Sequence, residues 1–367
     1  MIPMPPGLNG KAKGQPMFLS NRLSSGSRTA RQPSRVTWLA SLVALAVLTM
    51  LSGEKSVAEE TPDPANYYIS LAGAGAFWAL RVNDITVWSD FQGADTNLTV
   101  PVNAYLKQGQ NEIDLTFVSV KGSPLEYNVA NPDFYFVAQL QRVDLVSRDR
   151  QQATMVNLAL DAENGVVFPE VSRFGHPVET RSTPPMKIGR DRQDKADLVS
   201  GWGDQWTGRR VTAEFEISDP LPAGPWGVAP VIEDTHETRA QLLDAYRKFH
   251  AVLQSGDARQ VRANLEPAWR HLATTMHYAS LEEYLEKVSP LQDLAVTDSQ
   301  GRTLQPLDLV LGPEDFQIER MAGGRLVRII PDPIIWNTPS DPDNVGSLNV
   351  AFFRAADGSL QVGAVLY

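Results

Sequence analysis

The hydrophobic pattern of this 367-residue chain changes its period at one proline-rich segment. The segment, Asp219–Pro230, holds four prolines in twelve residues, which disfavour a helix and stiffen the chain. Before it, apolar residues recur at every second position, as in strands. After it, they recur first at helical spacing and then again at strand spacing. The sequence therefore predicts a β-rich domain followed by an α+β domain, joined by a proline-rich linker over residues 219–232.

Short strand patterns fill residues 59–218. Trp78, Leu80 and Val82 alternate with more polar neighbours, and the tight-turn dipeptide at 83–84 leads into a second β-rich run. Repeated turn signals between short strands favour an all-β antiparallel sandwich. A stretch rich in charge, Pro and Gly, about 173–203, is predicted to be an irregular loop of this domain. Further strands are predicted at 97–102, 111–120, 134–146, 155–160 and 211–217.

Three helices are predicted after the linker. The first carries an apolar stripe over 242–253, and the second runs from Ala258 and restarts or kinks at Pro267. The third begins at a capping box formed by Ser280 and Glu283. Helices followed by an antiparallel meander predict an α+β domain over 233–367, with three helices packed on a curved antiparallel sheet. The strands of that meander are predicted at 316–321, 325–330, 348–352 and 360–366.

Residues 1–58 have the pattern of an export signal. A basic flank precedes the apolar run Val36–Leu51, and the small-residue triplet 56–58 follows it. Translation could start at Met1 or at Met17. Cleavage after Ala58 would release a periplasmic or secreted protein. Without cleavage, residues 36–51 would form a transmembrane helix that anchors the protein in the inner membrane, with the C-terminal part outside the cytoplasm.

Composition narrows the classes of partner. The chain has no cysteine, which excludes disulfides, thiolate metal sites and cysteine nucleophiles. Residues 1–58 hold seven of the 33 basic and one of the 43 acidic residues, so the rest carries a formal charge of −16. Such an acidic protein is not expected to bind nucleic acid or an anionic membrane surface, which need a basic face. The negative net charge favours a cationic or neutral partner.

No catalytic motif is evident. The five histidines lack metal-ligand spacing, and no G-x-S-x-G motif occurs, so no catalytic residue, metal or cofactor is expected. His250 and His277 could each work with a carboxylate in acid–base chemistry, or be polar residues at helix ends. Trp202 and Trp206, in a Gly-rich loop, could stack on a sugar or anchor a partner, or fold back onto the sandwich. These four residues, together with Trp269 of the second helix, are the candidate ligand-binding residues.

Two segments of the β-rich domain are similar to the galactose-binding-like jelly roll. They are Trp78–Trp88 and Tyr105–Leu115. In that family a "V-N-G-x-x-V" hairpin leads to a "Y-L-x-x-G-x-N-x-I" strand. Here Asn83-Asp84 replaces Asn-Gly, while Tyr105, Leu106, Gly109, Asn111 and Ile113 match. The resemblance implies a sandwich over about 67–218 that serves as a binding or scaffolding module.

Residues 233–367 resemble the NTF2-like, cystatin-related α+β fold. The resemblance rests on three helices, with the helix text Ala245–Asp257, followed by a meander that closes on "F-F-R-A-A-D-G-S-L-Q-V". That fold forms a cone with a pocket between the helices and the sheet. It hosts enzymes, binding modules and interaction domains, so the resemblance implies a fold and not an activity.

The sequence favours a non-catalytic, exported protein of the bacterial cell envelope. Its partner would be a protein or a glycan, and an immunity or inhibitor role against a basic toxin is one concrete version. Two alternatives stay open. One is an enzyme, isomerase- or hydrolase-like, with an acid–base site in the C-terminal NTF2-like pocket. The other is a carbohydrate-binding accessory protein.

Overall fold

The computed structural model describes most of the chain beyond the predicted signal. The predicted signal at 1–58, Trp202 and Trp206 lie outside the described residues. No helix within the described ranges is long and apolar enough to cross a membrane. These ranges, which all belong to one compact unit, are 63–90, 93, 95–122, 126–127, 131, 133–161, 165–167, 169, 186–198, 207–307 and 316–366.

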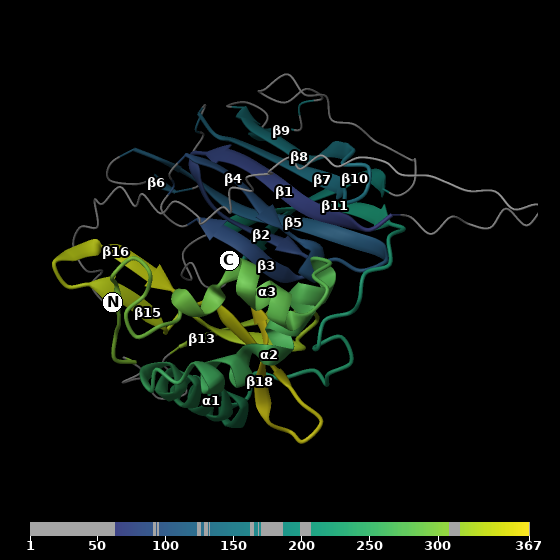
Figure 1. The fold of residues 1–367 in the computed structure, drawn as a ribbon. Helices are drawn as coiled ribbons and strands as arrows, with labels where there is room; N and C mark the ends of the chain where they lie inside the picture. The colour runs from purple at the N-terminus through teal and green to yellow at the C-terminus, as the bar shows by residue number, and fades with distance from the viewer. Residues whose placement is uncertain are drawn as a thin grey trace, which may run out of the picture. The chain divides into compact units, whose positions relative to one another are not determined.

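Two antiparallel sheets make up the β-rich part (Figure 1). The strand order is β4-β1-β7-β8-β9 in one sheet and β10-β11-β5-β2-β3 in the other, with β6 paired to the end of β5. The predicted β-rich part is therefore confirmed, and its arrangement is compatible with a sandwich. The strands are β1 (Ala65–Ala74), β2 (Ala76–Val82), β3 (Ile85–Asp90), β4 (Thr96–Pro101), β5 (Gly109–Lys121), β6 (Glu126–Tyr127), β7 (Tyr135–Asp144), β8 (Arg150–Asp161), β9 (Gly165–Val167), β10 (Met186–Leu198) and β11 (Thr207–Ile217); a short 3₁₀ turn, η1 (Asn103–Tyr105), precedes β5.

One apolar core joins the two sheets. Alternate residues of β1 are buried, as the period of two requires. Trp78 of one sheet meets Phe136 of the other edge-on, with ring centroids 5.0 Å apart. Both side chains are almost fully buried. Contacts of this kind stabilise a core beyond the apolar area they bury.

The stretch 173–203, predicted to be irregular, contains strand β10. It pairs antiparallel with β11 over most of its length, with one irregularity between Ile188 and Arg192. A charged sequence such as this one lacks the apolar alternation that marks a strand. Its backbone can still pair with a neighbouring strand, because an edge strand draws its hydrogen bonds from the ladder rather than from its side chains.

Among the described residues the α-helices are α1 (His236–Gln254), α2 (Ala258–Thr275) and α3 (Leu281–Val288). Each has an N-cap side chain that accepts from the first turn, as predicted for Ser280, whose Oγ accepts from the N–H of Glu283 at 3.1 Å. The predicted restart at Pro267 is wrong. Pro267 lies inside the single helix α2, and Leu265 and Trp269 on either side of it are buried in the core.

The C-terminal strands form two more antiparallel sheets, ordered β12-β15-β16 and β13-β14-β17-β18. β13 pairs with β14 around the turn at 322–324, and β17 pairs with β18 around the turn at 357–358. The described elements here are η2 (Pro290–Gln292), β12 (Thr303–Leu304), β13 (Gln317–Met321), β14 (Leu326–Ile330), β15 (Ile335–Thr338), β16 (Asp341–Ser347), β17 (Val350–Arg354) and β18 (Leu360–Val365).

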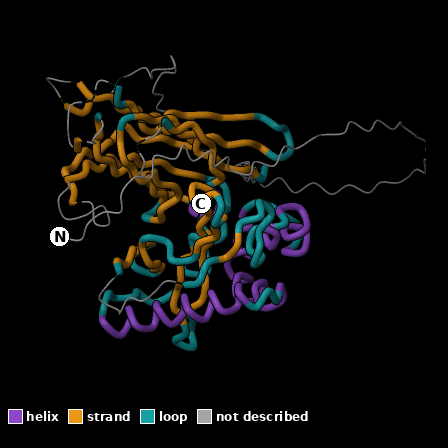
Figure 2. Tube along the Cα trace, turned by 90° about the vertical axis from the view of Figure 1, so that its left-hand side faces the viewer, coloured by secondary structure: helices purple, strands orange, loops and turns teal. Residues whose placement is uncertain are grey.

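The sheet β13-β14-β17-β18 is covered on both faces. Figure 2 shows C-terminal strands running beside the helices. Val327 and Phe352 belong to the core that the sheet shares with the helices. Their neighbours Leu326 and Phe353 belong to the core of the β-rich part. Successive side chains of a strand point to opposite faces, so the sheet packs against the helices on one face and against the β-rich part on the other. This position brings the turn between β13 and β14 next to the β-rich part.

Candidate functional site

The hairpin turn between β2 and β3 is fixed by two asparagines from the motif that suggested a jelly roll. Asn83 and Asp84 both have positive φ, as a two-residue hairpin turn requires. The Asn83 amide donates to the carbonyl of Tyr105 and to Oδ1 of Asn111, both at 2.8 Å. Asn111 in turn binds the backbone N–H and C=O of Lys107. The loop from Tyr105 to Asn111 is thus held rigidly against the hairpin.

The turn between β13 and β14 docks onto the same hairpin. The carboxylate of Asp84 accepts from the N–H of Gly323 at 3.0 Å, and its carbonyl accepts from the N–H of Ala322 at 3.2 Å. On the other side, the carbonyl of Gly324 accepts from the N–H of Ile232 at 2.7 Å. Backbone hydrogen bonds therefore fix this turn between the β-rich part and the proline-rich segment.

An open cleft of about 460 Å³ lies where these elements meet. Its walls come from the two turns, the loop before β5, strands β5 and β11, and the proline-rich segment. Its volume is in the range of small-ligand sites. Four charged side chains line it: Lys107, Glu112, Glu214 and Arg325.

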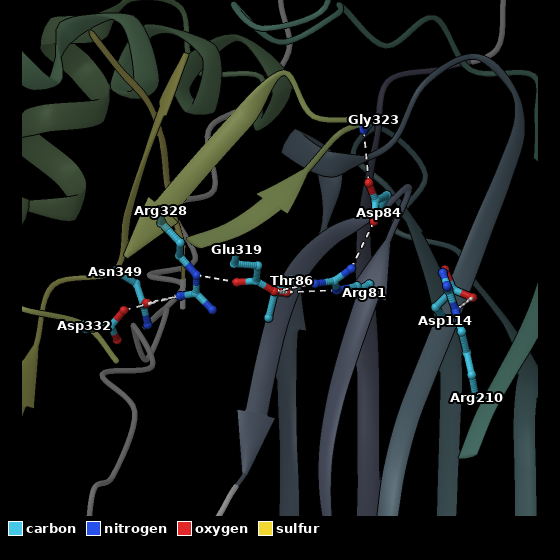
Figure 3. A network of polar contacts seen from close by, with 10 residues as sticks. All are labelled: Arg81, Asp84, Thr86, Asp114, Arg210, Glu319, Gly323, Arg328, Asp332 and Asn349. Atoms are coloured by element: carbon cyan, nitrogen blue, oxygen red, sulfur yellow. Dashed lines mark hydrogen bonds and ion pairs between the residues drawn. The ribbon is translucent and has the colours of Figure 1, made fainter. Parts of the chain in front are cut away.

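Beside the cleft, a buried ion network joins the β-rich part to the C-terminal sheet (Figure 3). Glu319 of β13 accepts from Arg81 of β2 and from Arg328 of β14, each at 2.5 Å. The hydroxyl of Thr86 on β3 donates to the same carboxylate. Burial alone would raise the pKa of Glu319, but the charges of Arg328 and Arg81 outweigh burial and lower it.

The network continues beyond Arg328. Its guanidinium donates to Oδ1 of Asn349 and lies 3.4 Å from Asp332 (Figure 3). Asp332 also accepts from the hydroxyl of Ser347 at 3.1 Å, and burial raises the pKa of its carboxyl. Every polar side chain of this network has a partner within the protein. Its geometry is that of a structural clamp between two sheets.

Three of the four charged side chains of the cleft differ, because they are not paired within the described protein. Within the described residues, Lys107, Glu214 and Arg325 make no side-chain hydrogen bond or ion pair. Glu112 lies directly opposite Glu214 in the ladder of β5 and β11, so two carboxylates face the same cleft. Like charges placed opposite one another in a sheet destabilise it.

Glu112 also interacts with a neighbouring carboxyl. Burial, followed by the hydrogen bond and the charge of Asp114, raises the pKa of Glu112 to about 7. Burial alone would raise the pKa of Asp114, but hydrogen bonds from Arg210 and Thr212 outweigh burial and lower it. Asp114 is therefore paired with Arg210 and Thr212 within the sheet. Glu112, which lines the cleft, changes its charge near neutral pH.

Sequence-predicted residues lie elsewhere. His250 on α1 is buried and donates from Nε2 to the carbonyl of Gln305 at 2.7 Å. His277, just after α2, donates to the carbonyl of Ala65 at 3.1 Å. Trp269 is buried in the core between helices and sheet. None of the three lines the cleft, and in the described part of the chain neither imidazole contacts a carboxylate. Whether they bind a ligand stays a prediction.

The cleft residues were missed by sequence reasoning. Glu112 and Glu214 are about a hundred positions apart, and only the pairing of β5 with β11 brings them together. Arg325 and Lys107 come from turns in different parts of the chain. The one available signal was the Asn83–Asn111 motif, which marked the loop that forms one wall.

The described residues form a mixed α and β structure, with antiparallel sheets in both parts and helices on the C-terminal side. No protein-family model, curated protein or solved structure matches this chain. No group of His, Cys, Asp or Glu within the described ranges could hold a metal ion.

Proposed function

We propose that this is an exported, non-catalytic binding protein of the bacterial cell envelope, and that its partner, a protein or a glycan, binds in the cleft. One observation carries the proposal. The polar side chains of the neighbouring clamp have partners within the protein, whereas Lys107, Glu214 and Arg325 of the cleft have no side-chain partner among the described residues. Charged groups held rigidly at a cleft without internal partners are available to a ligand.

The finer fold assignments support a binding role. The proposed jelly roll over about 67–218 and the proposed NTF2-like domain over 233–367 are both folds that host binding modules. The Asn83–Asn111 contact supports the first assignment, because it gives the matching motif residues a structural purpose. The packing of α1 and α2 on one face of the C-terminal sheet supports the second.

Location outside the cytoplasm rests on residues 1–58. The test is to express the full chain and a chain lacking these residues in a Gram-negative host, to fractionate the cells, and to sequence the N-terminus of the product. Recovery of the full chain from the cytoplasm would refute export. A new N-terminus at Glu59 would indicate cleavage, whereas an intact terminus in the membrane fraction would indicate an anchor at 36–51.

Binding in the cleft is tested by charge reversal. Immobilised wild-type protein is incubated with solubilised envelope protein and with envelope glycan, beside the variants Glu214→Lys and Glu286→Lys. Glu286 is exposed on α3 outside the cleft and makes the same change of charge. We expect wild type and Glu286→Lys to retain the same ligand and Glu214→Lys to lose it. Failure of the wild type to retain any ligand, or equal retention by all three, would refute the proposal.

The enzyme alternative is not favoured by a specific contact. An acid–base pair needs the imidazole within hydrogen-bond reach of a carboxylate, and the contacts of His250 and His277 are to backbone carbonyls. An immunity or inhibitor role remains one version of the binding function. The formal charge of −16 beyond Ala58 suits a basic partner.

A further inference from the structure

The two signs of charge in the cleft come from different elements. Glu112 and Glu214 stand on paired strands of one sheet, so the acidic side of the cleft is set by a β-ladder. Lys107 comes from the loop before β5, and Arg325 from the turn that leads into β14. An ideal Cβ placed on Gly323 would lie 3.3 Å from Nη1 of Arg325, so the guanidinium lies over the turn that lines the cleft.

These opposite charges do not neutralise one another. All four side chains line the same cleft, yet within the described ranges none of the acidic ones forms an ion pair with a basic one. The backbones that carry them cannot easily move together. Asn111 holds Lys107 at both its N–H and its C=O, and Asp84 holds the turn before Arg325. A rigid scaffold therefore keeps the two signs apart at one site.

A ligand complementary to such a site carries both signs itself. A neutral sugar would leave the charges of Lys107, Glu214 and Arg325 without partners, and a purely cationic ligand would meet Lys107 and Arg325. We infer that the cleft binds a zwitterionic peptide, whose ammonium lies at Glu112 and Glu214 and whose carboxylate lies at Lys107 and Arg325. This inference rests on the proposed binding function and specifies the chemistry of its ligand. Arginine is suited to a carboxylate because its planar fork can donate two hydrogen bonds.

The test uses trialanine with free ends as the probe, together with its N-acetylated form and its C-terminal amide. Binding to the full chain in mild detergent is measured by isothermal titration at low salt. We expect free trialanine to bind, and each blocked form to bind about fivefold more weakly for the loss of one partly exposed ion pair. High salt should weaken free trialanine more than either blocked form.

Variants assign each end of the probe. Glu214→Gln should lose the preference for a free ammonium and keep the preference for a free carboxylate, and Arg325→Gln should do the reverse. Glu286→Gln and Arg259→Gln, at exposed sites on α3 and α2, should behave as wild type. Equal affinity for all three probes, or no binding of any, would overturn the inference.

The outcome separates this inference from the proposed function. If the envelope ligand is retained through the cleft but the probes do not discriminate, the binding function stands and the zwitterionic ligand is wrong. If no envelope ligand is retained while trialanine binds with the expected preferences, the ligand chemistry stands and the envelope role is wrong.

Discussion

Replacing Glu319 by glutamine should destabilise the protein, because this carboxylate joins the β-rich part to the C-terminal sheet (Figure 3). The carboxylate is 9% exposed and binds two guanidiniums. Arg328 is itself 7% exposed, so the substitution leaves a buried cation short of one partner. Arg81 is more exposed and can turn to Asp84 and to water.

The size of the effect follows from burial. Breaking a buried ion pair by removing one partner costs about 3–5 kcal/mol. Arg328 keeps Asp332 as a second carboxylate, which places the expected loss at the lower end, about 3 kcal/mol. For a protein of this size that loss lowers the midpoint of thermal unfolding by about 4 °C. The free energy of unfolding is measured in urea by tryptophan fluorescence.

The loss should depend on pH. The folded pKa of Glu319 lies below its usual value of 4.5, so its stabilisation is complete above that value and disappears as the pH falls through the folded pKa. The difference between wild type and Glu319→Gln should therefore be largest at pH 7 and shrink below pH 4.5. Glu286→Gln, at an exposed site, should change stability by less than about 0.5 kcal/mol.

Two results would refute this reasoning. One is a loss below about 1 kcal/mol at pH 7, which would mean that water screens the pair despite its burial. The other is an equal loss at pH 7 and below pH 4.5, which would assign the effect to packing rather than to charge. The double variant Glu319→Leu with Arg328→Met removes both charges, and it should recover much of the stability lost in Glu319→Gln.

Three further predictions concern other parts of the structure. Asn103→Ala should lower the free energy of unfolding by about 3 kcal/mol, because this fully buried amide binds the backbones of β1 and α2. A loss below about 1 kcal/mol in thermal unfolding would contradict that role. The raised folded pKa of Glu112 should make the wild type lose stability as the pH rises from 4.5 to 7. Glu112→Gln should remove this loss. If urea unfolding gave the same pH dependence for both proteins, the prediction would be disproved. Ser280→Ala should cost about 1 kcal/mol through the N-cap of α3, and Ser280→Gly less, measured by urea unfolding; equal losses would argue against the cap.

Local patterns predicted the local structure of this chain well. The dipeptide at Asn83-Asp84 predicted a hairpin turn, and both residues adopt the positive φ that such turns need. Ser280 predicted a helix start and caps α3. Each of these features depends on neighbours within a few residues, so the sequence contains all the information needed.

Packing between distant segments was not predictable in the same way. Strands β14 and β17 are buried on both faces, and their apolar runs do not alternate as a half-exposed strand would. The proline-rich segment, predicted as a linker, is packed against the rest of the protein at two points. Asp219 is buried against Arg142 and Tyr67, and Trp226 meets His271 edge-on at 5.2 Å. Which partner buries a segment depends on the whole fold.

Among the described residues, the candidate ligand-binding residues from the sequence and the ones that line the cleft are different. Histidines and tryptophans stand out in a sequence, but His250 binds a backbone carbonyl and Trp269 is packed in the core. Glu112 and Glu214 look like ordinary surface charges until strand pairing sets them opposite one another. What separates a structural charge from an available one is whether the fold supplies its partner. Glu319 has three donors within the protein, whereas Glu214 has none among the described residues, and this contrast singles out the cleft as the place where a ligand would supply what the chain does not.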